Sequence, residues 1–229
     1  MTAPDEPHAH DDGHDHTHEH GHAPHPPARP DTDDRLTSDK TMEIAVRELL
    51  IEKGVINADD VRRAIEAMDA RSPAQGARIV ARAWTDPAYK ARLLADPNAA
   101  IKELGIEPGV YKLVVLENTT YVHNLVVCTL CSCYPRGVLG LPPDWYKSRA
   151  YRSRAVHEPR AVLREFGTEI ADDVAVHVHD STADMRYLVL PERPAGTEAL
   201  SESEVAELVT RDSMIGVARA RAPSRGVAR

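Results

Sequence analysis

The sequence predicts an α+β fold in which a helical N-terminal arm precedes a domain of layered helices and strands. From Thr41 onward the apolar residues follow helical i, i+3, i+4 spacing, and beyond Pro108 they follow the alternation typical of strands. A third observation, a proline- and histidine-rich start with few large apolar residues, predicts disorder there. We therefore divide the chain into a disordered tail (1–40), a helical arm (41–107), an α+β domain (108–218) and a flexible C-terminal tail (219–229).

The first 34 residues are acidic and rich in histidine. They hold nine acidic residues against one basic residue, so this segment accounts for the net charge of −8 of the 229-residue chain. Its histidines alternate with acids and small residues, a composition that binds nickel, cobalt or zinc loosely; they are His8, His10, His14, His16, His18, His20, His22 and His25. The pattern fits either a solubility tag with adventitious metal affinity or a segment that gathers metal.

The remaining 195 residues balance 27 acids against 27 bases, which excludes a strongly basic surface. We therefore expect no nucleic-acid partner. No apolar run approaches the ~20 residues of a membrane-spanning helix, and the N-terminus lacks the profile of a signal peptide, so we expect no membrane and a cytoplasmic location. The three cysteines, Cys128, Cys131 and Cys133, lie within six residues, which indicates local sulfur chemistry in a reducing compartment.

Five helices are expected between residues 41 and 107. The first ends at Gly54, the second opens with Asn57 and Asp60 in a capping arrangement, and the third precedes Asp86. Asp86 and Asp96 each stand before a proline, and each combination of a capping carboxylate and a proline opens a further helix. Two later helices are expected over 159–166 and 202–210, the latter capped by the serine at 201 and the glutamate at 204.

Four strands are expected in the second half of the chain. Lys112–Leu116 and Asn124–Val127 are rich in β-branched and long apolar residues. The segment 174–179 alternates valine with alanine and histidine, and Tyr187–Leu190 is expected to be its neighbour in the sheet after a turn near Ser181.

The cysteines form a C-x-x-C-x-C motif directly after the second of these strands. A dithiol redox site would use Cys128 and Cys131 and usually opens a helix, which Pro135 argues against. A tetrahedral zinc site needs a fourth ligand, for which His123 or His157 would have to fold back. An iron–sulfur cluster generally needs a fourth thiolate, and the chain has only three.

A further interpretation uses the backbone. Cys131 and Cys133 flank Ser132 so closely that an ion held by both thiolates also meets the amide nitrogens of Ser132 and Cys133. Amide nitrogens bind only when deprotonated, which takes a strongly Lewis-acidic ion such as trivalent cobalt or iron. Three sulfurs and two nitrogens leave a sixth octahedral position open for a substrate. The domain over 108–218 is therefore the expected metal-binding and catalytic domain.

The run CTLCSCYP at residues 128–135 resembles the metal loop of the nitrile hydratase alpha subunit and of the thiocyanate hydrolase gamma subunit. The resemblance covers roughly Thr41 to Val217 and implies a nitrile hydratase alpha-like fold. Its further segments are Ala83–Pro87, Leu141–Lys147, Tyr151–Arg154, Arg186–Tyr187, Leu190–Thr197 and Met214–Val217.

The resemblance implies one trivalent ion per chain, bound by the thiolates of Cys128, Cys131 and Cys133 and by the amides of Ser132 and Cys133. It also implies that Cys131 is oxidised to the sulfinic and Cys133 to the sulfenic state. Thr129 matches the cobalt-type sequence, so Co(III) is favoured over Fe(III). In the mechanisms proposed for the family, the ion polarises the nitrile, and the sulfenate oxygen of Cys133 attacks the carbon or activates water.

The resemblance implies three partners: a beta-type subunit whose arginines contact the oxidised sulfurs, a metallochaperone or activator that loads the ion, and a small nitrile or thiocyanate as substrate. The leading interpretation is the metal-bearing subunit of a cobalt nitrile hydratase. Arg136, however, stands where cobalt nitrile hydratases usually have a tryptophan. In this it resembles thiocyanate hydrolase, in which a matching arginine helps to receive the anionic substrate.

Three alternatives stay open at this point. Arg136 belongs either to a catalytic site or to an outward-facing contact with the partner. The chain is alternatively a thiocyanate hydrolase gamma subunit, which converts thiocyanate to carbonyl sulfide and ammonia. A different class, a non-catalytic thiol metal or redox carrier, predicts tetrahedral zinc or a reversible dithiol. We expect His123 to be structural, His157 to lie at the surface, and His177 and His179 to form an exposed polar strand face.

Overall fold

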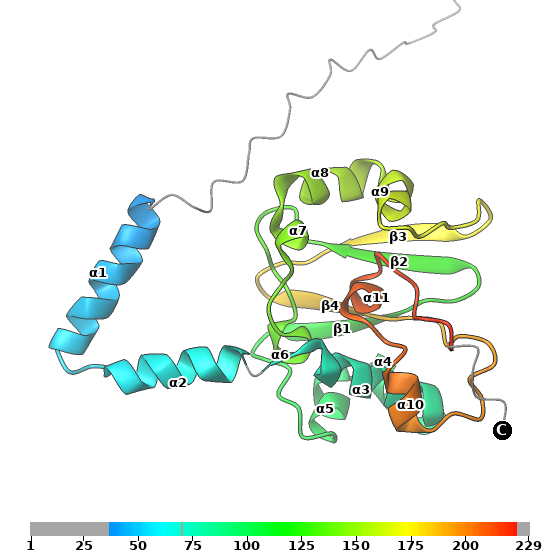
Figure 1. Cartoon of the computed structure of the whole chain (residues 1–229), viewed down its shortest axis with the longest axis horizontal. Helices are drawn as coiled ribbons and strands as arrows, with labels where there is room; N and C mark the ends of the chain where they lie inside the picture. Colours follow the sequence, from blue (N-terminus) through cyan, green and yellow to red (C-terminus); the bar gives the residue numbers. More distant parts are fainter. Residues whose placement is uncertain (1–36, 70, 224–229) are drawn as a thin grey trace, which may run out of the picture.

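The computed structural model describes residues 37–69 and 71–223, so almost all of the expected N-terminal tail and the last six residues lie outside it. The expected helices of the first half are present in order (Figure 1). Their bounds are α1 Ser38–Glu52, α2 Ala58–Asp69, α3 Pro73–Thr85, α4 Pro87–Ala95 and α5 Pro97–Lys102.

The expected caps open these helices. The Asp86 carboxylate accepts from the Tyr89 amide at 2.9 Å, and Asp96 does the same for the next helix at 3.1 Å. Asn57 and Asp60 each accept from the other's amide, at 2.9 and 3.0 Å. Because these side chains satisfy amides that have no partner within the helix, local sequence explains where α2, α4 and α5 begin.

The four strands form two parallel pairs rather than one continuous sheet. They are β1 Lys112–Glu117, β2 Val122–Val127, β3 Ala175–Asp180 and β4 Met185–Leu190. Strand β1 pairs with β4 from Lys112↔Met185 onward, and β2 pairs with β3 up to Val127↔Asp180. The expectation that 187–190 neighbours the strand before it in sequence is therefore wrong. Parallel pairs need long crossovers, and helices occupy the one between β2 and β3.

Six further helices complete the described part of the chain: α6 Arg136–Leu139, α7 Asp144–Lys147, α8 Arg149–His157, α9 Pro159–Glu165, α10 Glu202–Ala206 and α11 Arg211–Ile215. The helix expected at 159–166 is confirmed as α9. The one expected over 202–210 ends earlier, because Thr210 caps α11 by accepting from the Ser213 amide. The capping box of Ser201 and Glu204 is present in α10.

The core lies between the strands and the helices on either side of them. Helices α8 and α9 lie along the β2–β3 pair, α4 and α5 lie along β1, and α3 packs on α4, α6, α10 and α11 (Figure 1). Ile79 and Val80 of α3 and Leu125 of β2 are fully buried. Burying one such side chain stabilises the fold by about 1.5–3 kcal/mol.

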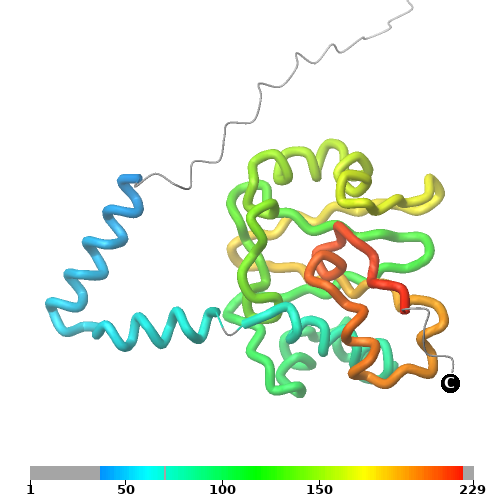
Figure 2. The backbone as a smooth tube through the Cα atoms, in the orientation of Figure 1, coloured from blue at the N-terminus to red at the C-terminus, as the bar shows by residue number. Residues whose placement is uncertain are grey.

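Helices α1 and α2 differ from the rest because neither has a buried residue. They project away from the strands and from the other helices (Figure 2). The helices α3 to α5, in contrast, pack on the strand-bearing part. The division at residue 107 stays a prediction. Among the residues that the structure describes, no helix is long and apolar enough to cross a membrane.

Candidate metal centre

The cysteine loop begins where β2 ends. The side chains of β2 are buried from His123 to Val127, and the chain leaves the sheet through fully buried Cys128. Cys131 is exposed and Cys133 is half-buried, so the loop turns outward after its first cysteine. The strand thus fixes one sulfur in the core and places the other two at the surface.

The three sulfur atoms converge on one point. The Sγ atoms of Cys128 and Cys131 are 3.6 Å apart, those of Cys131 and Cys133 are 3.2 Å apart, and all three lie within 4.8 Å of one another. All three cysteines are free. Within residues 37–69 and 71–223, the closely spaced group of metal-binding side chains consists of these cysteines, without histidine or carboxylate. Three soft donors in this arrangement fit a thiophilic transition metal.

The sulfurs influence one another's protonation. Hydrogen bonding from the Cys133 thiol is the main cause that lowers the pKa of Cys131, and the backbone N–H groups of Cys133 and Ser132 act in the same direction. Burial, followed by the hydrogen bond to Cys131, raises the pKa of Cys133 to about 12. In the backbone, the Cys131 amide donates to the Cys128 sulfur at 3.3 Å, which ties the loop to its buried first cysteine.

Three side chains from later elements hold this loop. Asp180, at the end of β3, accepts from the Thr129 amide at 2.9 Å and from its hydroxyl at 2.5 Å. Arg152 donates from Nη1 to the Cys131 carbonyl at 3.0 Å, and the Tyr146 hydroxyl donates to the Cys133 carbonyl at 2.9 Å. We missed all three from the sequence, although Tyr146 and Arg152 lie in segments that carry the family resemblance.

Aromatic rings support the loop from behind. The ring of Tyr134 meets that of Tyr146 edge-on with centroids 5.1 Å apart, and Trp145 meets Tyr151 at 4.9 Å. The Tyr151 hydroxyl donates to the Val126 carbonyl at 2.7 Å, which ties α8 to the end of β2. Burial raises the pKa of Tyr146, so this hydroxyl stays a donor to the loop at neutral pH.

Cationic side chains stand beside the loop. Arg136 is exposed at the first residue of α6, immediately after the cysteine motif. The guanidinium of Arg186, on β4, lies 5.1 Å from the ring centroid of Tyr111, and its charge opposes the rise of the Cys133 pKa. The Tyr111 hydroxyl accepts from the Gly137 amide at 3.1 Å, which links this cation–π pair to α6. The positive charges of Arg136 and Arg186 therefore favour an anion near the cysteine loop.

The histidines of the described chain stand apart from the sulfur group. His123 is 4% exposed; its Nε2 donates to the Gly216 carbonyl at 2.7 Å, and its Nδ1 accepts from the Asn118 amide at 3.3 Å. His179 bonds Asn124 at 2.8 Å, whereas His177 is exposed. A tetrahedral zinc site that recruits His123 therefore has no support, because both nitrogens of that ring are already used.

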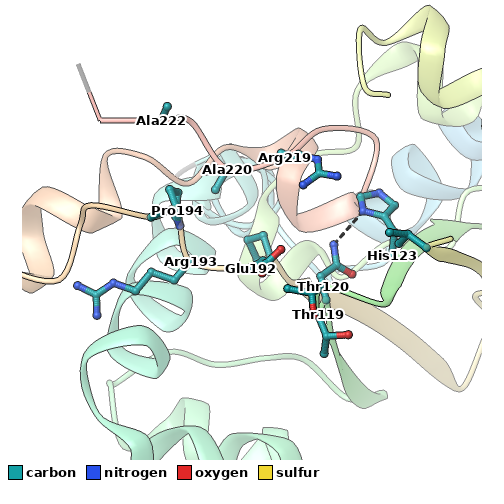
Figure 3. Close-up of a pocket in the computed structure, with 13 residues that line it drawn as sticks. Thr119, Thr120, His123, Glu192, Arg193, Pro194, Arg219, Ala220 and Ala222 are labelled. Carbon is teal, nitrogen blue, oxygen red and sulfur yellow. Dashed lines mark hydrogen bonds between the residues drawn. The ribbon is translucent and has the colours of Figure 1, made fainter. Parts of the chain in front are cut away.

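A cavity lies at the other end of β2 (Figure 3). Its volume is about 430 Å³, and residues at its wall include Thr119, His123 and Arg219. The Arg193 side chain points away from Arg219 in this view, because it donates to the Trp84 carbonyl at 2.8 Å. The residues that line the cavity include no cysteine, so the candidate metal centre lies outside this cavity.

Comparisons with known proteins show the family of the chain. Residues 37–218 match the family of the nitrile hydratase alpha chain. The chain is 52% identical over 184 residues to the low-molecular weight cobalt-containing nitrile hydratase subunit alpha of Rhodococcus rhodochrous, covering 79% of this chain and 88% of that one. It is 44% identical over 189 residues to the thiocyanate hydrolase subunit gamma of Thiobacillus thioparus, covering 77% and 78%.

A solved Fe-type nitrile hydratase variant from Comamonas testosteroni Ni1 shares the fold, with a TM-score of 0.75 and 42% identity over 84% of this chain and 98% of that chain. Fold and loop together define a class of protein in which three clustered thiols, a candidate metal centre, follow a buried strand. The chain belongs to the nitrile hydratase alpha chain family. The resemblance inferred from the cysteine motif and the expected fold are thus confirmed.

Proposed function

We propose that the chain is the metal-bearing subunit of a cobalt nitrile hydratase and that it hydrates a small nitrile to the amide together with a beta-type subunit. One observation carries the proposal. The three sulfurs lie within 4.8 Å of one another in the loop after β2 of a chain whose relatives include cobalt-containing alpha subunits. Because all three thiols are free, a reducing, cytoplasmic setting is also proposed.

The ligands of one ion would be the thiolates of Cys128, Cys131 and Cys133 and the amide nitrogens of Ser132 and Cys133. The convergence of the three sulfurs around Ser132 supports this set, because both nitrogens lie in the chain between or at the two outer cysteines. When bound, the ion would act as a Lewis acid that polarises the nitrile. Trivalent cobalt is proposed over iron because Thr129 follows the cobalt-type sequence and the Rhodococcus relative contains cobalt.

Two cysteines would take part in the chemistry beyond holding the ion. We place the sulfinic state at Cys131 and the sulfenic state at Cys133, whose oxygen attacks the nitrile carbon or takes a proton from the attacking water. Cys133 is only half-buried and Cys131 is exposed, so this chain alone leaves the reacting groups open to solvent. A partner that covers the loop would exclude bulk water and strengthen the electrostatic interactions inside.

The exposed apolar surface of helix α1 is evidence for a partner subunit. Met42, Val46 and Leu49 follow one face of α1 and are 65%, 47% and 47% exposed. Exposed apolar side chains at helical spacing mark a surface that another chain covers. We assign this surface to the beta-type subunit. A metallochaperone or activator that loads the ion remains part of the proposal, on the family resemblance.

The proposal is tested by co-expressing the chain with its neighbouring open reading frames and assaying amide formation from small nitriles, with and without cobalt in the medium. Cobalt-dependent amide formation is the expected result. A protein that contains zinc, keeps unmodified thiols and forms no amide would favour the thiol carrier instead.

Arg136 supports thiocyanate hydrolysis as a second candidate function. It is exposed directly after the cysteine loop, and the thiocyanate hydrolase relative is 44% identical. An uncovered guanidinium attracts a small anion in preference to an aliphatic nitrile. Assaying thiocyanate and nitriles on the same preparation separates the two functions, since carbonyl sulfide is released only from thiocyanate.

A further inference from the structure

Arg152 makes an unusual contact for a surface arginine. It lies in the middle of α8, is half-buried, and donates from Nη1 to the carbonyl oxygen of Cys131 at 3.0 Å. Within the described residues it forms no salt bridge, whereas Arg154 on the same helix pairs with Glu158 and Glu165, both at 2.5 Å. The charge of Arg152 is therefore directed at a backbone carbonyl instead of a carboxylate.

The carbonyl of Cys131 and the amide nitrogen of Ser132 belong to one peptide group. When that nitrogen becomes a metal ligand, its N–H bond breaks, the proton passes to water, and the nitrogen electron pair is shared with the ion. The negative charge that remains is delocalised over the nitrogen and the carbonyl oxygen, as the partial double bond of the peptide requires. A guanidinium hydrogen-bonded to this oxygen stabilises the charge more than a neutral donor does.

The Cys133–Tyr134 peptide group, two further along the loop, gives an internal comparison. The Cys133 carbonyl accepts from the Tyr146 hydroxyl, a neutral donor, at 2.9 Å. The nitrogen of that second peptide group belongs to Tyr134, which is outside the proposed ligand set. The charged donor thus stands on one of the two peptide groups that are expected to become anionic, the other being Ser132–Cys133, and the neutral donor stands on one that is not.

We propose that Arg152 is a positioning residue for metal loading: its guanidinium holds the Cys131–Ser132 peptide group and neutralises the charge on the Cys131 oxygen when the Ser132 nitrogen binds the ion. The inference rests on the proposed function, because it needs the amide of Ser132 among the ligands. Helix α8 is well placed for this role, since Ser148 caps it and Tyr151 ties it to the Val126 carbonyl.

Three variants of the full chain, co-expressed with the neighbouring reading frames at graded cobalt, test the inference. Arg152→Gln removes the charge, Arg152→Lys keeps it, and Arg149→Gln removes a charge from an exposed residue on the same helix. The measurements are cobalt per chain by elemental analysis and the sulfur-to-cobalt absorption band. Arg152→Gln should need about 10-fold more cobalt for half occupancy, a typical effect of losing a hydrogen bond to a ligand group.

The loaded fraction of Arg152→Gln should also show a shifted absorption band, because more charge remains on the ligand nitrogen. Arg152→Lys should restore loading in large part, and Arg149→Gln should match the wild type. Equal loading and identical spectra for Arg152→Gln and the wild type would overturn the inference while leaving the proposed function intact. So would equal losses in both glutamine variants, which would indicate a general charge effect. A wild-type chain that takes up no cobalt would overturn both.

Discussion

The two ends of strand β2 are built in opposite ways. At its start, the buried side chains of Asn118, His123 and Asn124 bond one another and the backbone, with Asn118 accepting from the Asn124 amide at 2.8 Å. At its end, the cysteine sulfurs contact mainly one another, and Cys131 is exposed. The polar side chains at the start of β2 thus make their hydrogen bonds within the chain, whereas the cysteine sulfurs at its end remain available to bind an ion. This difference locates the chemistry better than the volume of a cavity does.

The largest expected effect comes from removing a sulfur. Cys131→Ala takes away the donor that contacts both other sulfurs, at 3.6 and 3.2 Å. We expect cobalt to fall from about one ion per chain to below about 0.1, because a ligand set this small does not tolerate the loss of a central donor. Elemental analysis and amide formation, measured on one preparation, check this.

Leu130→Ala is the matched control, since Leu130 lies in the same loop and is 85% exposed. Its cobalt content should equal that of the wild type. Retained turnover in Cys131→Ala would reject the assignment of the metal centre.

A substitution at the opposite end of β2 should change the stability of the fold and leave the cobalt content unchanged. Gly216 has a φ of +92°, and a Cβ there would collide with the carbonyl oxygen of Asn124. Gly216→Ala should therefore lower the free energy of unfolding by about 3 kcal/mol. Gly105 has a similar φ of +71° but open space around it, so Gly105→Ala should cost only about 1 kcal/mol.

Chemical denaturation of both glycine variants measures the difference. Equal losses would show that the close approach of Gly216 to β2 does not matter. A loss of cobalt from correctly folded Gly216→Ala would show that the two ends of the strand are coupled.

A smaller effect is expected from Arg136→Trp, which changes substrate choice at the reactive end. Replacing an exposed cation by an apolar ring should lower the ratio of thiocyanate to nitrile turnover by about 10-fold, the size of one favourable charge interaction. Turnover of both substrates by the wild type and the variant gives the ratio. An unchanged ratio would mean that Arg136 is outside the substrate pocket, with cobalt content as the control for an intact centre.

The smallest effect concerns the protonation of His123. Burial lowers its pKa, although the hydrogen bond to Gly216 opposes the shift. Below the unfolded value of about 6.5, the unfolded chain then binds more protons than the folded chain, so stability falls as the pH falls. The contribution of this one group is at most about 1.4 kcal/mol per pH unit.

His123→Gln should reduce this pH dependence between pH 7.5 and 5.5. Denaturation curves at the two pH values measure the slope. An identical slope in wild type and His123→Gln would refute the role assigned to His123.

Local signals in the sequence were enough to predict most elements. The carboxylates of Asp86 and Asp96 cap the helices that they were expected to cap, because capping depends on neighbours three residues apart. Pairing of strands was not predictable in this way. Tyr187–Leu190 pairs with β1, more than 70 residues earlier, and no local periodicity encodes that choice. Helix α8 was also missed, since it buries only Tyr151 and Ala155.

The candidate site shows the same limit. The spacing of the cysteines predicted that their sulfurs could share one ion, and the structure brings all three sulfurs together. The groups that hold the loop come from elsewhere in the chain: Asp180 through the pairing of β3 with β2, and Arg152 through the packing of α8. Nothing in the spacing of the motif indicates these contacts, because they depend on the tertiary fold.

The most direct test of the central claim is elemental analysis combined with mass spectrometry of the peptide that spans Cys128 to Cys133, on protein co-expressed with its neighbouring reading frames. We predict one cobalt per chain, two added oxygens on Cys131 and one on Cys133. Zinc with three unmodified thiols would contradict the account and identify the chain as a thiol metal carrier.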